Sequence, residues 1–178
     1  CSELAKANKY SLYLWPPHCI LGTDGHNLAG LINEARFYHG FARGRQPLNM
    51  VKGMNPLTEN YSVFSAEVLK GHDGQVIAQR DINILKKLNE VDYMILAGEA
   101  GSHCVKSSID DIMTEILAND PKLAKKVYIM EDCMSAVVIP GVVDFTKNQD
   151  DALSAYKNAG MNVVKSTTKM TDWPGIKL

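Results

Sequence analysis

The chain has 178 residues, of which 46% are apolar and 22% charged, and its 19 basic and 20 acidic residues give a net charge of −1. This length predicts a single globular domain, and the composition excludes a disordered, collagen-like or coiled-coil chain. Because there is no basic excess and no apolar run of about 20 residues, we expect neither nucleic-acid binding nor membrane association.

The four cysteines, at positions 1, 19, 104 and 133, lie far apart and form no Cys-x-x-Cys pair. Such usage favours a reduced, cytoplasmic compartment over a secreted domain held together by disulfides. The first residue is Cys1 rather than Met, which fits a fragment or processed chain, a lipid-modified N-terminal cysteine, or an artefact of numbering.

Apolar periodicity in the first half of the chain predicts a helix over 27–37 and a short strand at 48–51. The stretch 66–79 is typical of an inserted hairpin or loop because it is rich in turn residues. Asp81 is the expected N-cap of the next helix, whose apolar positions are Ile84, Leu85 and Leu88.

The second half alternates regularly between the two element types. The predicted elements are a strand at 93–97, a helix at 104–117, a strand at 127–130, a helix at 152–159 ended by Gly160, and a strand at 161–164. Continuous apolar strands between helices predict an α/β fold whose mostly parallel sheet is covered by helices.

Ligands bind beyond the carboxyl ends of the strands in open α/β sheets. Cys104 is the strongest candidate there, because it begins a helix after a turn that contains the small residues Gly98, Ala100, Gly101 and Ser102. The helix dipole and the unpaired N–H groups favour a thiolate and can hold a developing oxyanion. The alternative is a small buried cysteine at a helix start.

Other candidates are ambiguous on their residues alone. Lys52, at a strand end, either supports a thiolate or is a solvated lysine. His18, held by two prolines, is either a metal ligand or an ordinary histidine, since the chain has no His-x-His, Asp-x-His or His-Glu-x-x-His pattern. Trp15 and His103 are either pocket walls or core residues.

Four segments occur in a characteristic order: WPPHCILGT at 15–23, KGMNPLTENYSVF at 52–64, LAGEAGSHCVKSSIDD at 96–111 and YIMEDCMSAV at 128–137. Together they resemble the isochorismatase-like cysteine hydrolases, and within these the nicotinamidase-like branch. The resemblance implies a Rossmann-like isochorismatase fold, a three-layer α/β/α structure around a six-stranded parallel sheet. It also implies hydrolysis of a small amide, such as nicotinamide, to an acid and ammonia through a thioester.

The resemblance further implies roles for individual residues. By this resemblance Cys104 is the nucleophile and Lys52 is the triad lysine. Ala100 and Cys104 are the oxyanion donors, and the Glu99–Ala100 peptide bond is cis. Trp15 and His103 are pocket walls, and His18 is a ligand of a zinc-like divalent ion. No organic cofactor is implied. The family often has Tyr where this chain has His103, so we expect a different leaving-group pocket.

The family's triad aspartate and Asp-x-His metal pair precede its Trp-Pro-x-His-Cys element, and the fourteen residues before Trp15 contain neither. We therefore expect residues 1–178 to be a single isochorismatase-like domain whose N-terminal strands are absent from this chain. An upstream segment or another chain would then complete the site, and we expect the protein to form a homo-oligomer or to associate with the missing N-terminal segment. A catalytically impaired binding or scaffold homologue, or a redox-sensing thiol protein, is the alternative.

Overall fold

The computed structural model describes residues 2–81 and 83–177, and the chain divides into two compact units, residues 1–51 and 52–178. The first unit holds helix α1 (Ser2–Lys6), the 3-10 turn η1 (Asp24–His26) and helix α2 (Gly30–Arg43). The helix predicted at 27–37 is confirmed, although it begins at Gly30 and continues to Arg43. Gly44, at φ +59°, ends it in the left-handed conformation that glycine adopts readily.

The strand predicted at 48–51 is wrong. These four residues are exposed and join no sheet within the described chain. An apolar run becomes a strand only where a neighbouring strand takes up its backbone hydrogen bonds, and local sequence does not report that partner. Lys52 therefore follows an irregular segment.

The second unit is built on a parallel sheet of order β1-β2-β5, formed by β1 (Met94–Leu96), β2 (Val127–Met130) and β5 (Asn162–Val164). Tyr128 of the central strand is in register with Ile95 on one side and Asn162 on the other. All three strands were predicted from their apolar runs, whereas the six-stranded sheet that the resemblance implies stays a prediction.

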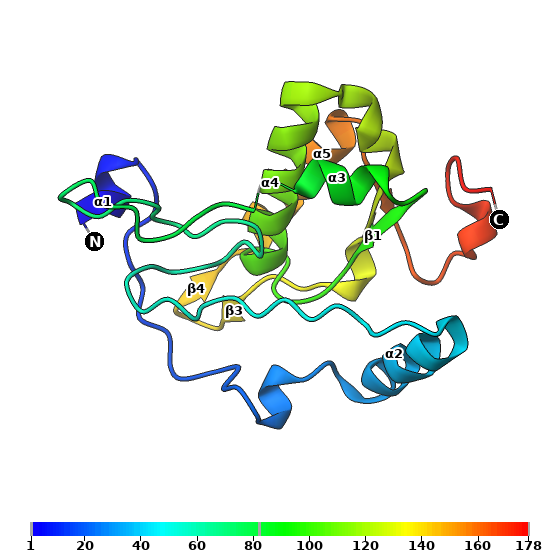
Figure 1. Ribbon diagram of the computed structural model, residues 1–178, viewed down its shortest axis with the longest axis horizontal. Helices are drawn as coiled ribbons and strands as arrows, with labels where there is room; N and C mark the ends of the chain where they lie inside the picture. The colour runs from blue at the N-terminus through cyan, green and yellow to red at the C-terminus, as the bar shows by residue number, and fades with distance from the viewer. Residues whose placement is uncertain (1, 82, 178) are drawn as a thin grey trace. The chain divides into compact units, whose positions relative to one another are not determined.

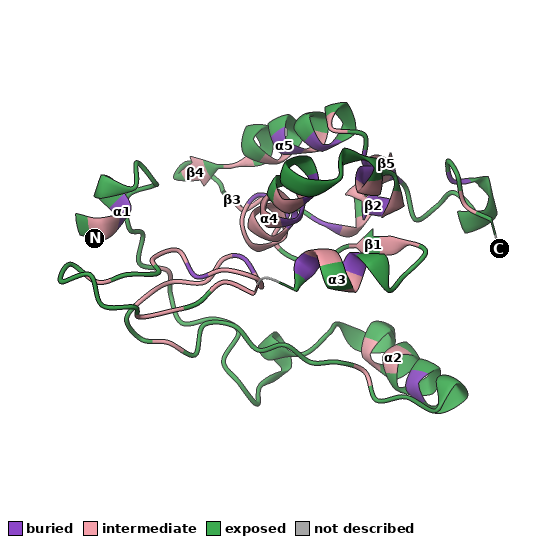
Figure 2. Ribbon diagram, turned by 45° about the horizontal axis from the view of Figure 1, so that its top comes forward, coloured by how far each residue is buried: buried purple, intermediate pink, exposed green. Residues whose placement is uncertain are grey.

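One face of this sheet is covered by helices (Figures 1 and 2). They are α3 (Ile84–Asn89), α4 (Cys104–Asn119) and α5 (Thr146–Asn158), together with the 3-10 segment η2 (Pro121–Lys126). Buried side chains of these elements form one core with Val127 and Ile129 of β2. The predicted helices are confirmed, with α5 starting six residues earlier than expected.

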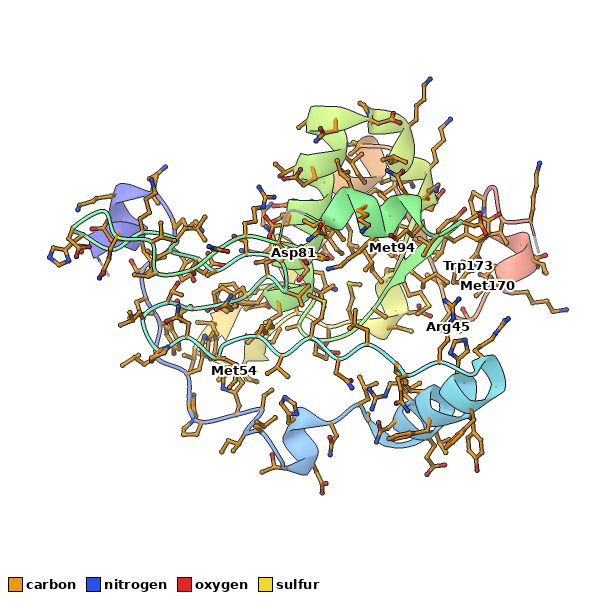
Figure 3. All side chains as sticks on the ribbon, viewed as in Figure 1. Arg45, Met54, Asp81, Met94, Met170 and Trp173 are labelled. Atoms are coloured by element: carbon orange, nitrogen blue, oxygen red, sulfur yellow. The ribbon has the colours of Figure 1, made fainter. Side chains whose placement is uncertain are left out.

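Side chains alternate between the two faces of the sheet along β2, so Tyr128 points to the face opposite the helices, which the C-terminal segment covers. The ring of Tyr128 stacks on Trp173, with centroids 5.8 Å apart, and its hydroxyl donates to Pro174 O. Trp173 and Met170 belong to the C-terminal turn around η4 (Met170–Asp172) in Figure 3. Lys177 N–H donates to the Tyr93 hydroxyl at 2.8 Å, which ties this segment to the start of β1.

Three local features complete the comparison with the sequence. Asp81 is not the N-cap: Asn83 takes that position, and the Asp81 carboxylate accepts its N–H at 2.8 Å. The hairpin expected within 66–79 is confirmed by an antiparallel bridge between Lys70 and Val76. A second hairpin, β3 (Val138–Ile139) with β4 (Val143–Asp144), was missed because strands of two residues carry no periodic signal.

Among the described residues, no helix combines the length and apolar character needed to cross a bilayer. Cys19, Cys104 and Cys133 are free thiols.

Candidate active site

Cys104 is the first residue of α4 and follows the turn that leaves β1. Gly98 opens this turn at φ +131°, a backbone region that residues with a Cβ rarely enter. The Gly98 N–H donates to Cys133 O at 3.0 Å, and the Gly101 N–H donates to Ser135 O at 2.8 Å. These two bonds hold the turn against the segment that follows β2.

The backbone of this turn leaves two donors available. The Glu99–Ala100 bond is cis, as the resemblance implied, and Ala100 O accepts from the N–H groups of His103 (3.0 Å) and Val105 (3.1 Å). Within residues 2–81 and 83–177, neither the Ala100 N–H nor the Cys104 N–H donates a hydrogen bond. Unpaired N–H groups at a helix start suit a negatively charged oxygen.

The ammonium of Lys52 lies beside the thiol. Its Nζ is 3.3 Å from Cys104 Sγ and donates to Asn60 O at 2.8 Å. Lys52 is exposed and Cys104 half-buried, so a small molecule in solution can reach the pair. Residues 52 positions apart in sequence thus meet as the resemblance implied, and their catalytic roles stay predictions.

The loop that carries Lys52 is docked on α4 by polar contacts. The buried Ser62 hydroxyl donates to Asp111 Oδ2 at 2.5 Å, and Val63 N–H donates to Ser108 Oγ at 3.1 Å. Both acceptors lie on α4, the helix that starts at Cys104. The segment around Asn60 is therefore fixed to the same rigid element as the nucleophile, which sets the position of the lysine ammonium.

His103 is anchored by its neighbour in the turn. Ser102 Oγ lies 2.8 Å from His103 Nδ1 and accepts the Val137 N–H at 3.0 Å. Since the hydroxyl already accepts one hydrogen bond, it can give its own proton to Nδ1, which fixes the imidazole orientation. Ser102 is itself buried, so this anchor is shielded from water.

Two aromatic rings flank the imidazole of His103. Its centroid lies 4.6 Å from that of Phe145, nearly perpendicular to it, and 5.5 Å from that of Tyr61. Burial, with a smaller contribution from the positive charge of Lys106, lowers the pKa of His103 below its ordinary value of 6.5. The ring is accordingly neutral at neutral pH and offers an aromatic face beside the thiol.

Trp15 and His18 belong to the first unit, and their assignment to the site stays a prediction. The Trp15 ring packs against Tyr13 at a centroid distance of 4.6 Å. His18 is exposed, with Nδ1 2.7 Å from Pro16 O. In the part of the chain that the structure describes, no three His, Cys, Asp or Glu residues gather as a metal site. These residues alone do not fit a bound zinc-like ion.

Sequence reasoning did not single out Ser135, Phe145 or Gln149, which all contact the turn or His103. Gln149 of α5 packs so closely on the turn that a Cβ added at Gly101 would lie 2.0 Å from its Oε1. This oxygen is buried and has no hydrogen-bond partner among the residues that the structure describes. The segment YIMEDCMSAV contained Ser135, but no local pattern indicated the other two.

Comparison with curated proteins finds a relative among amidases. The nicotinamidase of Escherichia coli is 26% identical to this chain over 102 residues, which are 56% of the chain and 39% of the relative. The chain therefore matches about two fifths of the curated relative's length. No family model matches the chain.

Comparison with solved structures finds the same fold. Nicotinamidase PncA from Bacillus subtilis aligns with a TM-score of 0.50 at 20% identity, over 85% of this chain and 65% of that one. The pyrazinamidase/nicotinamidase of Streptococcus mutans gives 0.51 at 20% identity, over 85% and 64%. The yeast nicotinamidase Pnc1p, bound to the inhibitor nicotinaldehyde, gives 0.51 at 18% identity, over 86% and 59%.

At these identities the structural likeness establishes the fold, an α/β fold with a parallel sheet. The sequence match to a nicotinamidase is independent of the coordinates and points to the same group of proteins. The chain thus has the isochorismatase fold, and its resemblance to the nicotinamidase-like branch of the isochorismatase-like hydrolases is confirmed.

Proposed function

We propose that the protein is a cysteine amidohydrolase that cleaves a small amide, such as nicotinamide, to its acid and ammonia. The observation that carries this proposal is the 3.3 Å contact between Lys52 Nζ and Cys104 Sγ at the start of α4, next to two unpaired N–H groups. The curated relative and the aligned Bacillus subtilis structure are nicotinamidases, which supports amide hydrolysis as the reaction class.

In the first step the Cys104 sulfur attacks the amide carbon. A sulfur–carbon bond forms, and the electron pair of the carbonyl moves onto its oxygen. The Ala100 and Cys104 N–H groups hold this oxyanion, and the Lys52 ammonium attracts the negative charge of the sulfur before attack. Preorganised backbone donors of this kind usually supply the largest part of the stabilisation in acyl transfer.

In the second step the carbon–nitrogen bond breaks. Its electron pair leaves with the nitrogen, which takes a proton and departs as ammonia, and the thioester remains on Cys104. Water then adds to the thioester carbon, the oxyanion forms again on the same N–H groups, and the sulfur leaves with its electron pair as the acid is released.

These proton transfers need a base. Within residues 2–81 and 83–177, Lys52 bonds to a carbonyl and a sulfur but forms no ion pair with a carboxylate. Our proposal assigns the proton transfers to the aspartate of the family's triad, supplied by an upstream segment or by another chain. No step uses a metal ion, and a zinc-like ion on His18 stays a prediction.

The pocket wall in this proposal is the neutral imidazole of His103, and the role of Trp15 as a pocket wall stays a prediction. An aromatic amide can lay its ring against His103, because Ser102 and Phe145 fix the imidazole in place. The reduced, cytoplasmic setting inferred from the cysteines also stays a prediction.

The test is ammonia release from nicotinamide and a panel of small amides. We expect the wild type to be active and Cys104→Ala to lose at least about a thousandfold in kcat, since removing a nucleophile disables the whole unit. Cys133→Ala, which removes a second half-buried thiol, is the matched control and should keep its rate. Equal rates for wild type and Cys104→Ala would refute the proposal.

A catalytically impaired binding homologue is the second candidate. The contacts of Lys52 favour this candidate, because no carboxylate among the described residues forms an ion pair with its ammonium group. In this case the wild type would bind nicotinamide in equilibrium dialysis without releasing ammonia. Cys104→Ala would then bind the amide equally well, since no covalent step would be involved.

A further inference from the structure

We propose that Glu99 and Ser135 form a clamp that positions the Ala100 N–H for the oxyanion, and that both act as positioning residues. Because an oxyanion arises only if Cys104 attacks a carbonyl, this role rests on the proposed function. Neither side chain belongs to the motif residues to which the resemblance gives a role.

Ser135 forms hydrogen bonds to the turn with its carbonyl, its hydroxyl and its N–H group. Its carbonyl accepts the Gly101 N–H at 2.8 Å. Its hydroxyl and its N–H both donate to Glu99 Oε2, at 2.9 Å and 3.3 Å. Glu99 and Gly101 are the residues on either side of Ala100, so one serine fixes the backbone before and after the donor.

The clamp is the centre of a longer brace. The segment from Cys133 to Val137 runs beside the turn and bonds to it at both ends: Cys133 O accepts the Gly98 N–H, and Val137 N–H donates to Ser102 Oγ. Only the clamp uses a charged group. Hydrogen bonds to a carboxylate are about twice as strong as those between neutral groups, so the bonds between Glu99 and Ser135 are the strongest in this brace.

The clamp does not contribute to the core. Glu99 and Ser135 are both exposed, and neither belongs to the buried cluster, to which the segment after β2 contributes Met134 instead. Loss of the clamp should therefore leave the fold intact while loosening a donor that must lie within a few tenths of an ångström of its place. A misplacement near 1 Å costs about a hundredfold in rate.

An aldehyde measures the oxyanion site without any hydrolysis. The Cys104 sulfur bonds to the carbon of nicotinaldehyde, the carbonyl electron pair moves to oxygen, and the resulting hemithioacetal places that oxygen on the Ala100 and Cys104 donors. The oxygen takes a proton from water, and no oxidant is consumed. Alkylation of the same sulfur by iodoacetamide displaces iodide at a saturated carbon and creates no oxyanion, so it serves as the internal control.

The experiment compares both reactions in the purified protein and its variants. For Glu99→Ala we expect aldehyde affinity to fall by about 10- to 100-fold, somewhat less than removal of an oxyanion donor costs, while iodoacetamide alkylation changes less than about twofold. Glu99→Gln keeps an acceptor for Ser135 and should restore affinity to within about threefold. Ser135→Ala keeps its N–H and should lie between the two. Glu90→Ala, an exposed glutamate at the end of α3, should match the wild type.

Several outcomes would overturn the clamp. They are an unchanged aldehyde affinity in Glu99→Ala, a parallel loss of alkylation, a Glu99→Gln variant as weak as Glu99→Ala, or a wild type that forms no hemithioacetal on Cys104. If Glu99→Ala fails to fold by circular dichroism, Ser135→Ala and Glu99→Gln decide alone. A wild type that binds the aldehyde but releases no ammonia from any amide refutes the proposed function and leaves the clamp standing.

Discussion

The turn before Cys104 has no room for a methyl group at Gly101, so we expect Gly101→Ala to destabilise the protein. A Cβ there would lie 2.0 Å from Gln149 Oε1, 2.7 Å from Gln149 Cδ and 3.1 Å from Met134 Cγ. The Gln149 oxygen would have to retreat by roughly 1.5 Å to reach ordinary contact, and Met134 by a few tenths. Either these groups move or the turn does.

The cost can be bounded from the neighbours. Within residues 2–81 and 83–177, Gln149 Oε1 accepts no hydrogen bond, so its retreat costs packing alone. Overpacking a filled site typically costs about 1–3 kcal/mol, and the flexible glutamine places this case at the lower end, about 1–2 kcal/mol. The φ of Gly101 is not in the left-handed region, so the backbone adds no strain.

A double-mutant cycle with Gln149→Ala isolates the clash. Truncation removes both of the closest atoms, so Gly101→Ala should cost at least about 1 kcal/mol less in that background, as measured by urea unfolding. Gly25→Ala is the matched control, because its added Cβ meets only Thr23 Oγ1, at 3.8 Å. An equal cost in both backgrounds, or no cost in either, would refute this account of the turn.

Two further predictions follow from titrating groups. Burial lowers the pKa of His103 in the folded protein, so below the unfolded value of about 6.5 the unfolded chain binds the extra proton. The free energy of unfolding should therefore begin to fall as pH drops through about 6.5, by less than about 1.4 kcal/mol per pH unit for this one group. His103→Asn should flatten that part of the curve, and an unchanged slope would contradict the assignment. Tyr156, fully buried, donates to Asp110 Oδ1 at 2.7 Å, and burial together with the Asp110 charge raises its pKa. Tyr156→Phe should lower the free energy of unfolding by about 1–2 kcal/mol in urea melts, because Asp110 loses the hydrogen bond from the Tyr156 hydroxyl. An unchanged midpoint of urea unfolding would contradict this prediction.

The fold was predictable where burial leaves a periodic trace. Val127 to Met130 form a continuous apolar run because β2 is the central strand and both of its faces are covered. The helical stripe that includes Ile109, Ile112 and Ile116 likewise records the packing of α4 on the sheet. The run at 48–51 is also mostly apolar but, within the described chain, pairs with no strand, so apolar character alone gave the wrong answer there.

The site was predictable only in part, for a related physical reason. The turn before Cys104 follows from the end of an apolar strand and a cluster of small residues, which are local signals. The proximity of Lys52 was implied by the resemblance and not by spacing, since 52 positions separate the two residues. Ser135 and Gln149 contact the turn from 34 and 48 positions beyond Gly101, Ser135 through hydrogen bonds and Gln149 through close packing, and neither kind of contact leaves a periodic pattern in the sequence.

These long-range contacts divide the site into two halves with separate supports. The thiol and its lysine depend on the loop around Asn60, which Ser62 and Val63 dock onto α4. The oxyanion donors depend on the segment after β2, through Ser135 and its neighbours. Because the supports share no residue, substitutions in the loop should slow alkylation and aldehyde binding together, whereas substitutions in the segment should weaken aldehyde binding alone. Coupling between the two sets would mean that α4 itself, and not its separate braces, holds the geometry of the site.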